Sequence, residues 1–295
     1  MGRGETENTK GLVIIVDTLY DIMEKLLPFS WVEYNFMKNA LLAIIIITPL
    51  FGILGTMVIN NRMAFFSDAL GHSALTGIAV GTIFGISDTN ISMVLYAIIF
   101  AILLNYIKRR KTLSTDTVIS VFSSLSMSIG LMILSKGGNF SRYSSMLVGD
   151  ILSITVKEVG LLCIIFFITL IYWLLAFNKL HSVGVNISLA RSKNIKSNLL
   201  EDSFSILIAI IVMLSIKWVG ILIINALLIL PAATSRNIAS NVREYHLFSI
   251  LVAIFSGVIG LVLSFYLGTA TGPTVVIIAA ILFFATLFIS SIKSK

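Results

Sequence analysis

The sequence predicts a polytopic α-helical membrane protein. Of its 295 residues, 57% are hydrophobic and only 12% are charged, a composition that soluble domains rarely have. Long apolar segments recur from residue 36 to the C-terminus, whereas the strands of a membrane β-barrel would alternate apolar and polar residues. The predicted fold class is therefore all-α, with about nine transmembrane helices.

Residues 1–30 form an extension ahead of the predicted transmembrane domain, which covers 31–295. Within the extension, apolar side chains recur at helical spacing between residues 11 and 27, and the acids Asp17, Asp21 and Glu24 fall on another face. This pattern predicts an amphipathic helix in the membrane interface rather than a membrane-spanning helix or a secretory signal peptide. The apolar positions are Leu12, Ile15, Val16, Leu19, Met23 and Leu26.

Nine apolar segments follow the extension, and each predicts one spanning helix. Several are shorter than the roughly 20 residues of a straight crossing, and short or broken helices are common in transporters. The polar-flanked stretch 145–158 is too short to cross and is expected to form a re-entrant or interfacial turn. The nine segments are approximately 36–59, 63–86, 91–107, 117–134, 159–177, 203–217, 219–235, 247–267 and 274–292.

The basic residues predict the orientation. With a cytoplasmic C-terminus, 13 of the 21 lysines and arginines fall in inner segments and four in the outer loops that follow the first span. This bias is the usual positive-inside signal, so the net charge of +7 indicates membrane topology rather than nucleic-acid binding. The same orientation puts the N-terminal helix on the outer face. The single cysteine, Cys163, allows neither an internal disulfide nor a cysteine-based metal site.

An acid and an imidazole interrupt the second apolar segment, in the stretch FFSDALGHSALTG. Asp68 and His72 are four residues apart, so on a helix they share one face, near the middle of the bilayer. An ionised acid at that depth costs about 3 kcal/mol on insertion scales, so it is expected to face protein or a water-filled cavity. Carboxylate oxygen and imidazole nitrogen are ligands for divalent ions such as zinc, and both can reach one ion from this spacing.

Other interpretations of the pair remain open at this stage. Asp68 and His72 could form a structural hydrogen bond or a proton relay instead of a metal site. The other two histidines, His181 and His246, fall in predicted inner loops and are expected to be surface residues.

Further polar side chains occur inside the predicted spans. Ser120, Ser124 and Ser128 form a stripe on the fourth, and they either bond back to helix carbonyls or line a wet path. Asn105 and Asn225 are single amides in spans, expected to make hydrogen bonds between helices, and Asn225 is also a candidate for lining the path. No G-x-x-x-x-G-K-[ST] phosphate loop occurs, so ATP would have to be bound by a partner chain.

Several stretches together resemble the membrane permeases of ATP-binding-cassette importers for zinc and manganese, most closely the zinc-uptake permeases. The resemblance covers nearly all of the chain from about residue 36. It is carried, in this order, by NRMAFFSDALGHSALTGIAVG (61–81), DTVISVFSSLSMSIGLMILS (116–135), MLVGDILSIT (146–155), WVGILIINALLILPAATSR (218–236) and GPTVV (272–276).

The resemblance implies a homodimer in the cell membrane of a prokaryote, with the path at the interface between the two copies. It implies no cofactor in this chain, two cytoplasmic ATPase subunits that bind ATP, an extracytoplasmic metal-binding protein, and Asp68 and His72 as contacts of a transported zinc, manganese or iron ion. The polar segment 178–202 would be the cytoplasmic loop that couples to the ATPase. Within it, the coupling residues would be Ser188, Leu189, Ala190, Arg191, Ser192, Lys193 and Asn194.

This sequence also departs from the family pattern. Ser124 stands where some zinc-type relatives carry a histidine, and Thr76 where many relatives have proline or leucine. The first departure weakens the preference for zinc over manganese or iron. Two other functions stay open: a permease for a siderophore- or cobalamin-type solute, and a metal-assisted intramembrane hydrolase using Asp68 and His72.

Overall fold

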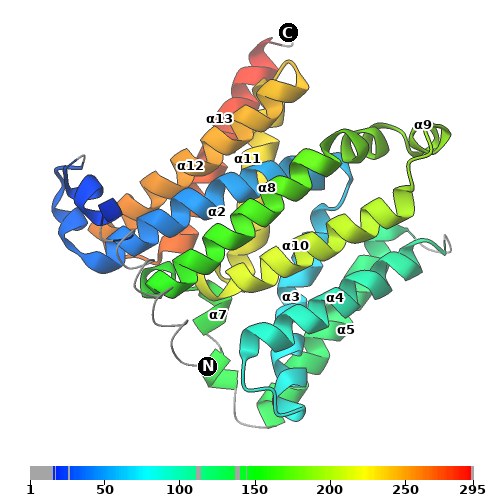
Figure 1. Cartoon of the computed structure of the whole chain (residues 1–295), viewed down its shortest axis with the longest axis horizontal. Helices are drawn as coiled ribbons and strands as arrows, with labels where there is room; N and C mark the ends of the chain where they lie inside the picture. Colours follow the sequence, from blue (N-terminus) through cyan, green and yellow to red (C-terminus); the bar gives the residue numbers. More distant parts are fainter. Residues whose placement is uncertain are drawn as a thin grey trace.

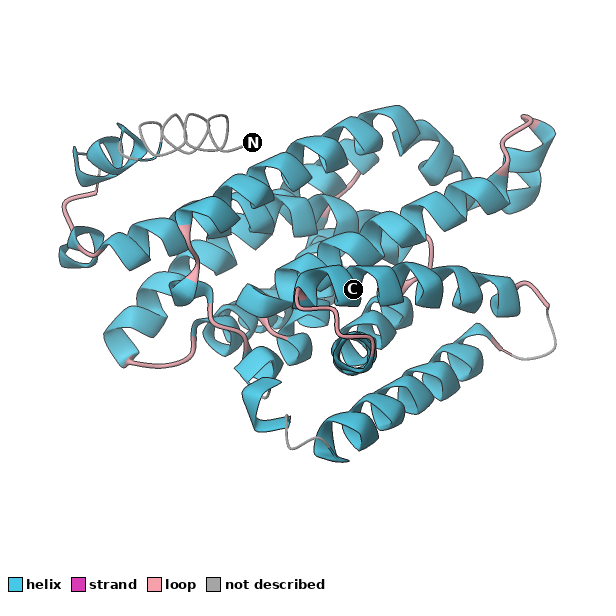
Figure 2. Cartoon of the chain, turned by 60° about the horizontal axis from the view of Figure 1, so that its bottom comes forward, coloured by secondary structure: helices cyan, strands magenta, loops and turns pink. Residues whose placement is uncertain are grey.

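All regular structure in the described part of the chain is helical (Figures 1 and 2). The computed structural model describes residues 16, 18–25, 27–110, 114–136, 140–143 and 145–293. Nine long helices coincide with the nine apolar segments, which confirms the all-α class. These helices are α2 (Asn35–Asn60), α3 (Ala64–Ile83), α4 (Thr89–Lys108), α5 (Thr115–Lys136), α8 (Val156–Val185), α10 (Ser197–Val219), α11 (Ile221–Ile238), α12 (Val242–Leu267) and α13 (Thr271–Lys293).

Seven helices in the described ranges are long and apolar enough to cross a membrane. The other two of the nine are α3, whose small and polar residues lower its hydropathy, and α11, which at 18 residues is the shortest of the nine. Both pack inside the bundle: α3 contacts α4, α5, α10 and α11, and α11 contacts α2, α12 and α13 as well. A helix surrounded by other helices needs no lipid-compatible surface, so polar side chains are tolerated on these two.

The short elements lie ahead of α2 or in the connections between the long helices. They are η1 (Ser30–Glu33), α6 (Phe140–Tyr143), α7 (Ser145–Val148), η2 (Ile151–Ser153) and α9 (Ile187–Ser192). The stretch 145–158 therefore forms short turns and the start of α8, and does not cross the membrane by itself.

Helices α8 and α10 extend beyond their apolar segments, because a helix satisfies its own backbone groups even where its side chains are polar. Only 186–196, which includes α9, separates them.

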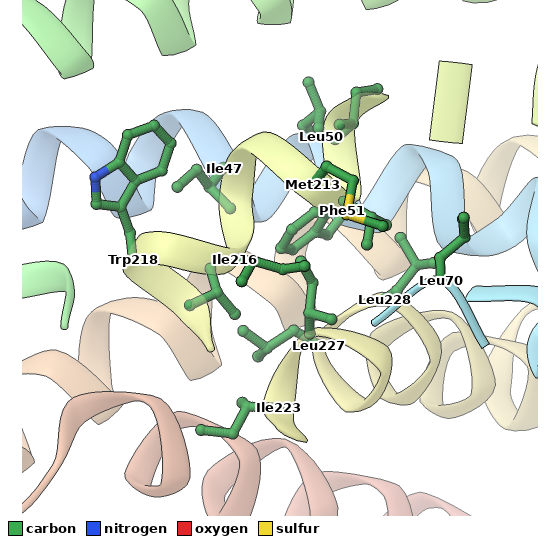
Figure 3. Close-up of a cluster of buried hydrophobic side chains, with 14 of the residues drawn as sticks. Ile47, Leu50, Phe51, Leu70, Met213, Ile216, Trp218, Ile223, Leu227 and Leu228 are labelled. Carbon is green, nitrogen blue, oxygen red and sulfur yellow. The ribbon is translucent and has the colours of Figure 1, made fainter. Parts of the chain in front are cut away.

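The hydrophobic core lies where α2, α3, α10 and α11 meet (Figure 3). Phe51 of α2, Met213 of α10 and Leu228 of α11 are all at most 1% exposed and point into this cluster. Glycines let these helices approach closely. A Cβ atom on Gly55 would lie only 1.9 Å from the carbonyl oxygen of Leu228, so α2 and α11 are in backbone contact there.

Two rows of small residues, four positions apart, act as packing surfaces: Ala69, Ser73, Gly77 and Gly81 on α3, and Ser256, Gly260 and Ser264 on α12. A Cβ on Gly77 of α3 would lie 2.9 Å from the Cα atom of Met93 in α4, and one on Gly260 of α12 would lie 2.6 Å from the Cα atom of Val275 in α13. The first row thus holds α3 firmly against α4, and with it the Asp68–His72 pair.

Candidate functional site

Asp68 and His72 face each other on α3, as their spacing predicts. The Nε2 atom of His72 lies 3.6 Å from Oδ2 of Asp68. The side chains are 29% exposed for His72 and 46% for Asp68, so both reach a surface of this single chain. The Nδ1 atom of His72 is buried and makes no hydrogen bond within the described chain. The side chains of Asp68 and His72 are therefore partly exposed, whereas the Nδ1 side of the His72 ring is buried.

A side chain from α11 orients the carboxylate. The amide of Asn225 donates from Nδ2 to Oδ1 of Asp68 at 3.4 Å, and its Oδ1 accepts a hydrogen bond from the Ser67 hydroxyl at 2.6 Å. The expected interhelical hydrogen bonding of Asn225 is confirmed. With Oδ1 engaged by Asn225, the other carboxylate oxygen, Oδ2, faces His72. Ser67 was not identified from the sequence, and its only signal was its position beside Asp68.

The pair opens into a small pocket of about 250 Å³ between α3 and α5. Ser120, Ser123 and Ser124 of α5 face it across from Asp68 and His72. Ser128 is exposed on α5 but is not among the residues that line this pocket. The remaining lining residues are Phe65, Ala69, Ile119 and Met127.

One turn beyond His72, the two helices come together. A Cβ on Gly130 of α5 would lie 2.6 Å from the backbone nitrogen of Thr76. The Thr76 hydroxyl donates to the carbonyl of Ser126, and the Ser126 hydroxyl lies 2.9 Å from that of Tyr96 in α4. This contact closes the space between α3 and α5 at that level.

The donor set suits transient contact with a divalent ion. Two ligands of a tetrahedral zinc ion, with bond lengths of 2.0–2.1 Å, lie about 3.4 Å apart, close to the separation of the two facing atoms here. Among the described residues, no group of three or more His, Cys, Asp and Glu side chains gathers into a metal site. Two protein ligands per chain leave the remaining positions to water, hydroxyls or a second chain.

The expectation that His181 and His246 are surface residues is wrong for His246. It belongs to α12, is 6% exposed, and its ring packs against Trp173 and Phe177 of α8 at centroid distances of 5.7 and 5.3 Å. His181 lies on α8 and stacks on Phe177. The loops expected around both residues are instead parts of long helices. Rings of α8 cover the imidazole of His246 on α12, whereas the ring that stacks on His181 belongs to its own helix.

The predicted coupling residues form a compact turn between α8 and α10. Ser188, Ala190, Arg191 and Ser192 belong to α9, and Lys193 and Asn194 follow it, with Asn194 at a φ of 57°. Ala190 is fully buried, whereas Arg191, Lys193 and Asn194 are exposed. The backbone of Leu189 is helical, but its side chain lies outside the described part. A short helix, α9, is therefore present at this point of the chain.

The start of α10 is tied to α4. Arg109 donates to Oδ1 of Asp202 at 2.6 Å and to the carbonyl oxygen of Asn198 at 2.8 Å. Asn105, only 4% exposed, donates to the same carboxylate oxygen at 3.0 Å and to the Ser205 hydroxyl at 2.9 Å. The interhelical bonding expected of Asn105 is thus confirmed. Through α4, which packs on α3, the residues that follow α9 are linked to the helix that carries the pair.

Comparison with known proteins identifies the family. The model of the ABC 3 transport family matches residues 33–290. The chain belongs to the ABC 3 transport family. It is 35% identical over 259 residues to the high-affinity zinc uptake system membrane protein ZnuB of Haemophilus influenzae, covering 86% of this chain and 98% of that protein.

Another relative in the ABC 3 transport family is named for a different metal. The manganese import system permease protein ScaB of Streptococcus gordonii is 26% identical, with 88% of this chain and 92% of that protein covered. The solved structure of PsaBC from Streptococcus pneumoniae in complex with Fab superposes with a TM-score of 0.78 at 24% identity, covering 93% of this chain and 96% of that one. The fold is therefore that of an ABC 3 permease.

Proposed function

We propose that this chain is the permease subunit of an ATP-driven importer that moves a divalent transition-metal ion into the cytoplasm, with zinc as the first choice and manganese or iron next. The observation that carries the proposal is the Asp68–His72 pair on an enclosed helix, beside a small pocket lined by hydroxyls. The zinc and manganese permeases among its relatives support the same class of cargo. The chain itself is not an enzyme, and ATP hydrolysis belongs to a partner subunit.

The path is proposed to run between two copies of the chain. The exposed side of α5 carries Ser120, Ser124 and Ser128 next to large apolar residues such as Leu125, which is 55% exposed. Hydroxyls gain nothing from contact with acyl chains, whereas a row of them facing a second copy could replace part of the hydration shell of an ion. The closed contact between Thr76 and Gly130 also favours a route over α5 rather than within one protomer.

The other partners follow from the proposed orientation, with the C-terminus in the cytoplasm of a prokaryotic cell. The exposed polar residues around α9, including Arg191 and Lys193, would dock onto a cytoplasmic ATPase subunit, and the buried Ala190 would anchor this turn to the permease. A metal-binding protein would deliver the ion to the opposite side. ATP-driven closure of the ATPase pair then rocks the helices about the dimer axis and alternates access to the pair.

Weak binding is part of the proposed mechanism. An ion held by a complete tetrahedral cage of protein ligands would leave slowly, whereas conduction requires sites that are weak enough to release. Asp68 and His72 supply one oxygen and one nitrogen, and Asn225 keeps the carboxylate turned toward the imidazole. The ion would exchange some of its water for these two ligands and regain it on release.

The two alternative functions receive less support from the geometry. A siderophore- or cobalamin-type solute is larger and would not need an acid and an imidazole facing each other at mid-depth, so the Asp68–His72 pair favours a free divalent ion as cargo. A hydrolase would need a further group to position water or substrate. The neighbours of the pair within the described chain are Ser67, Asn225 and the serines of α5, which do not complete such a site.

The decisive experiment is uptake by the reconstituted complex. Proteoliposomes that contain the permease and its ATPase, supplied with the metal-binding protein, should accumulate zinc, manganese or iron only when ATP is present on the ATPase side. Each metal is measured alone and in competition, with a ferric siderophore as the competing large solute. ATP-dependent uptake of the siderophore without uptake of any free divalent ion would overturn the proposal.

The Asp202 contacts predict a variant that separates ATP hydrolysis from transport. Asp202→Ala removes the acceptor shared by Arg109 and Asn105, so α10 should move without α4 when the ATPase closes. We expect ATP hydrolysis to persist while the metal transported per ATP falls several-fold. The matched control is Glu201→Ala, which removes a neighbouring acid on the same helix turn. Equal coupling ratios in the two variants would show that these contacts transmit no motion.

A further inference from the structure

A helical segment outside the family match packs against the start of α2. The family model begins at residue 33, and the segment 18–25 precedes it. Met23 is 9% exposed, and the backbone nitrogen of Leu27 donates to its carbonyl at 2.9 Å. The Tyr20 hydroxyl donates to Oδ1 of Asn39 on α2. The segment is thus held by side chains of the permease domain.

Lys38 is the main attachment point. It lies at the end of the first turn of α2 and is 3% exposed, although a buried cation near a helix N-terminus is unfavourable. Its ammonium group forms an ion pair with Glu24 and lies 5.1 Å from the centre of the Tyr20 ring. The only other acceptor that it reaches in the described chain is Oδ1 of Asn35, at 3.5 Å. The charge of Lys38 is therefore neutralised by the segment 18–25.

The docked segment presents two different flanks. Leu19 and Ile22 are 37% and 46% exposed and, three residues apart on a helix, share one flank. Asp21 and Lys25, four residues apart, are exposed on the other flank. The segment buries Met23 against the protein, yet it still shows an apolar flank to its surroundings.

Exposed aromatic rings mark the surroundings of this segment as the edge of the membrane. Tyr34 and Phe36, at the start of α2, are 49% and 41% exposed. Tyr34 lies 5.8 Å from the ring of Phe265, and its neighbour Tyr266, at the end of α12, is 60% exposed. Rings gathered at the ends of spanning helices are typical of the boundary between lipid and water. Figure 1 shows the N-terminal segment (dark blue) at this edge of the bundle, beside α2.

We propose that the segment 18–25 is a lipid-binding helix, with Leu19 and Ile22 inserted among the acyl chains at this membrane surface and the Glu24–Lys38 pair fixing its position on α2. The occupant of the apolar flank is lipid because the segment packs on the start of α2, where the exposed rings of Tyr34 and Phe36 are typical of the boundary between lipid and water. The proposal concerns the surface of the molecule and does not depend on which ion is transported.

Fluorescence quenching by lipid tests this placement. In a full-length Cys163→Ala background, Ile22→Cys and the matched control Asp21→Cys are labelled with an environment-sensitive fluorophore and reconstituted into vesicles that contain nitroxide-labelled acyl chains. Quenching at position 22 should exceed that at position 21 by about twofold or more, with a blue-shifted emission. Equal quenching at both positions would overturn the proposal. It would also be overturned if position 22 were shielded from quenching and this shielding disappeared when the protein was diluted in the membrane. The second of these results would indicate a contact between copies of the chain.

A further variant tests the role of the ion pair. Glu24→Gln removes the charge that neutralises Lys38, so the segment should lose its fixed orientation and the difference between positions 21 and 22 should shrink. The matched control is Glu33→Gln, which changes an exposed acid on the neighbouring turn η1. An undiminished difference in the Glu24→Gln protein would show that the pair does not hold the helix.

Discussion

Replacing His72 with alanine should abolish metal uptake while the permease still assembles. Among the described residues that line the pocket, His72 and Asp68 are the imidazole and the acid proposed to contact the ion, so the removal of His72 leaves Asp68 alone in this role. Loss of even an outer-shell partner costs roughly 10–100-fold in metal affinity at protein sites, so the loss of a direct ligand should cost about 100-fold or more. The measurement is the concentration dependence of ATP-driven uptake in proteoliposomes.

Two further variants separate a ligand role from a structural one. His181→Ala removes a histidine that lies on α8, stacked on Phe177 and outside the pocket, and it should leave uptake unchanged. Asp68→Asn keeps the size of the side chain but removes its charge, and it should impair uptake as His72→Ala does. Co-purification of the His72→Ala protein with its ATPase would show that the complex still forms. Normal uptake by that protein would remove the pair from the transport path.

Substituting Gly220 with alanine should strongly destabilise the folded protein. Gly220 alone connects α10 to α11, its φ is 96°, and an added Cβ would lie 2.3 Å from the carbonyl carbon of Val148. The backbone strain costs on the order of 1–3 kcal/mol, and the clash with rigid backbone adds to it. Because folded proteins are stable by only about 5–15 kcal/mol, the sum is a large fraction of the total. Thermal denaturation of detergent-purified protein measures the effect.

The matched control for this variant is Gly85→Ala. Gly85 also has a positive φ, 68°, but an added Cβ would meet no atom within 4 Å. It should cost only the roughly 1–2 kcal/mol of a left-handed alanine, and the protein should remain folded. Similar melting temperatures for the two variants would mean that the backbone contact between Gly220 and Val148 contributes nothing to stability.

Several properties of this protein could be predicted from local patterns. Each spanning helix is a continuous apolar segment, so the nine helices and their order could be predicted from hydropathy. Asp68 and His72 face each other because residues four apart share one face of a helix, whatever surrounds it. The close contact at Gly77 likewise follows from the small residues at every fourth position of α3. The ends of α8 and α10 could not be predicted from hydropathy, because a helix can continue into water after its side chains change from apolar to polar.

The amino-acid sequence alone thus determined which segments are helical and which acid and imidazole share a helix face, since both depend on neighbours within a few residues. Only the tertiary structure decided that Asn225, 157 positions away, orients Asp68, that α5 supplies hydroxyls to the pocket, that Glu24 neutralises the buried Lys38, and that aromatic rings of α8 cover His246. These contacts depend on which helices pack together and in what rotation. That choice is made by the sum of many side-chain contacts across the whole bundle, and no short stretch of the sequence contains it.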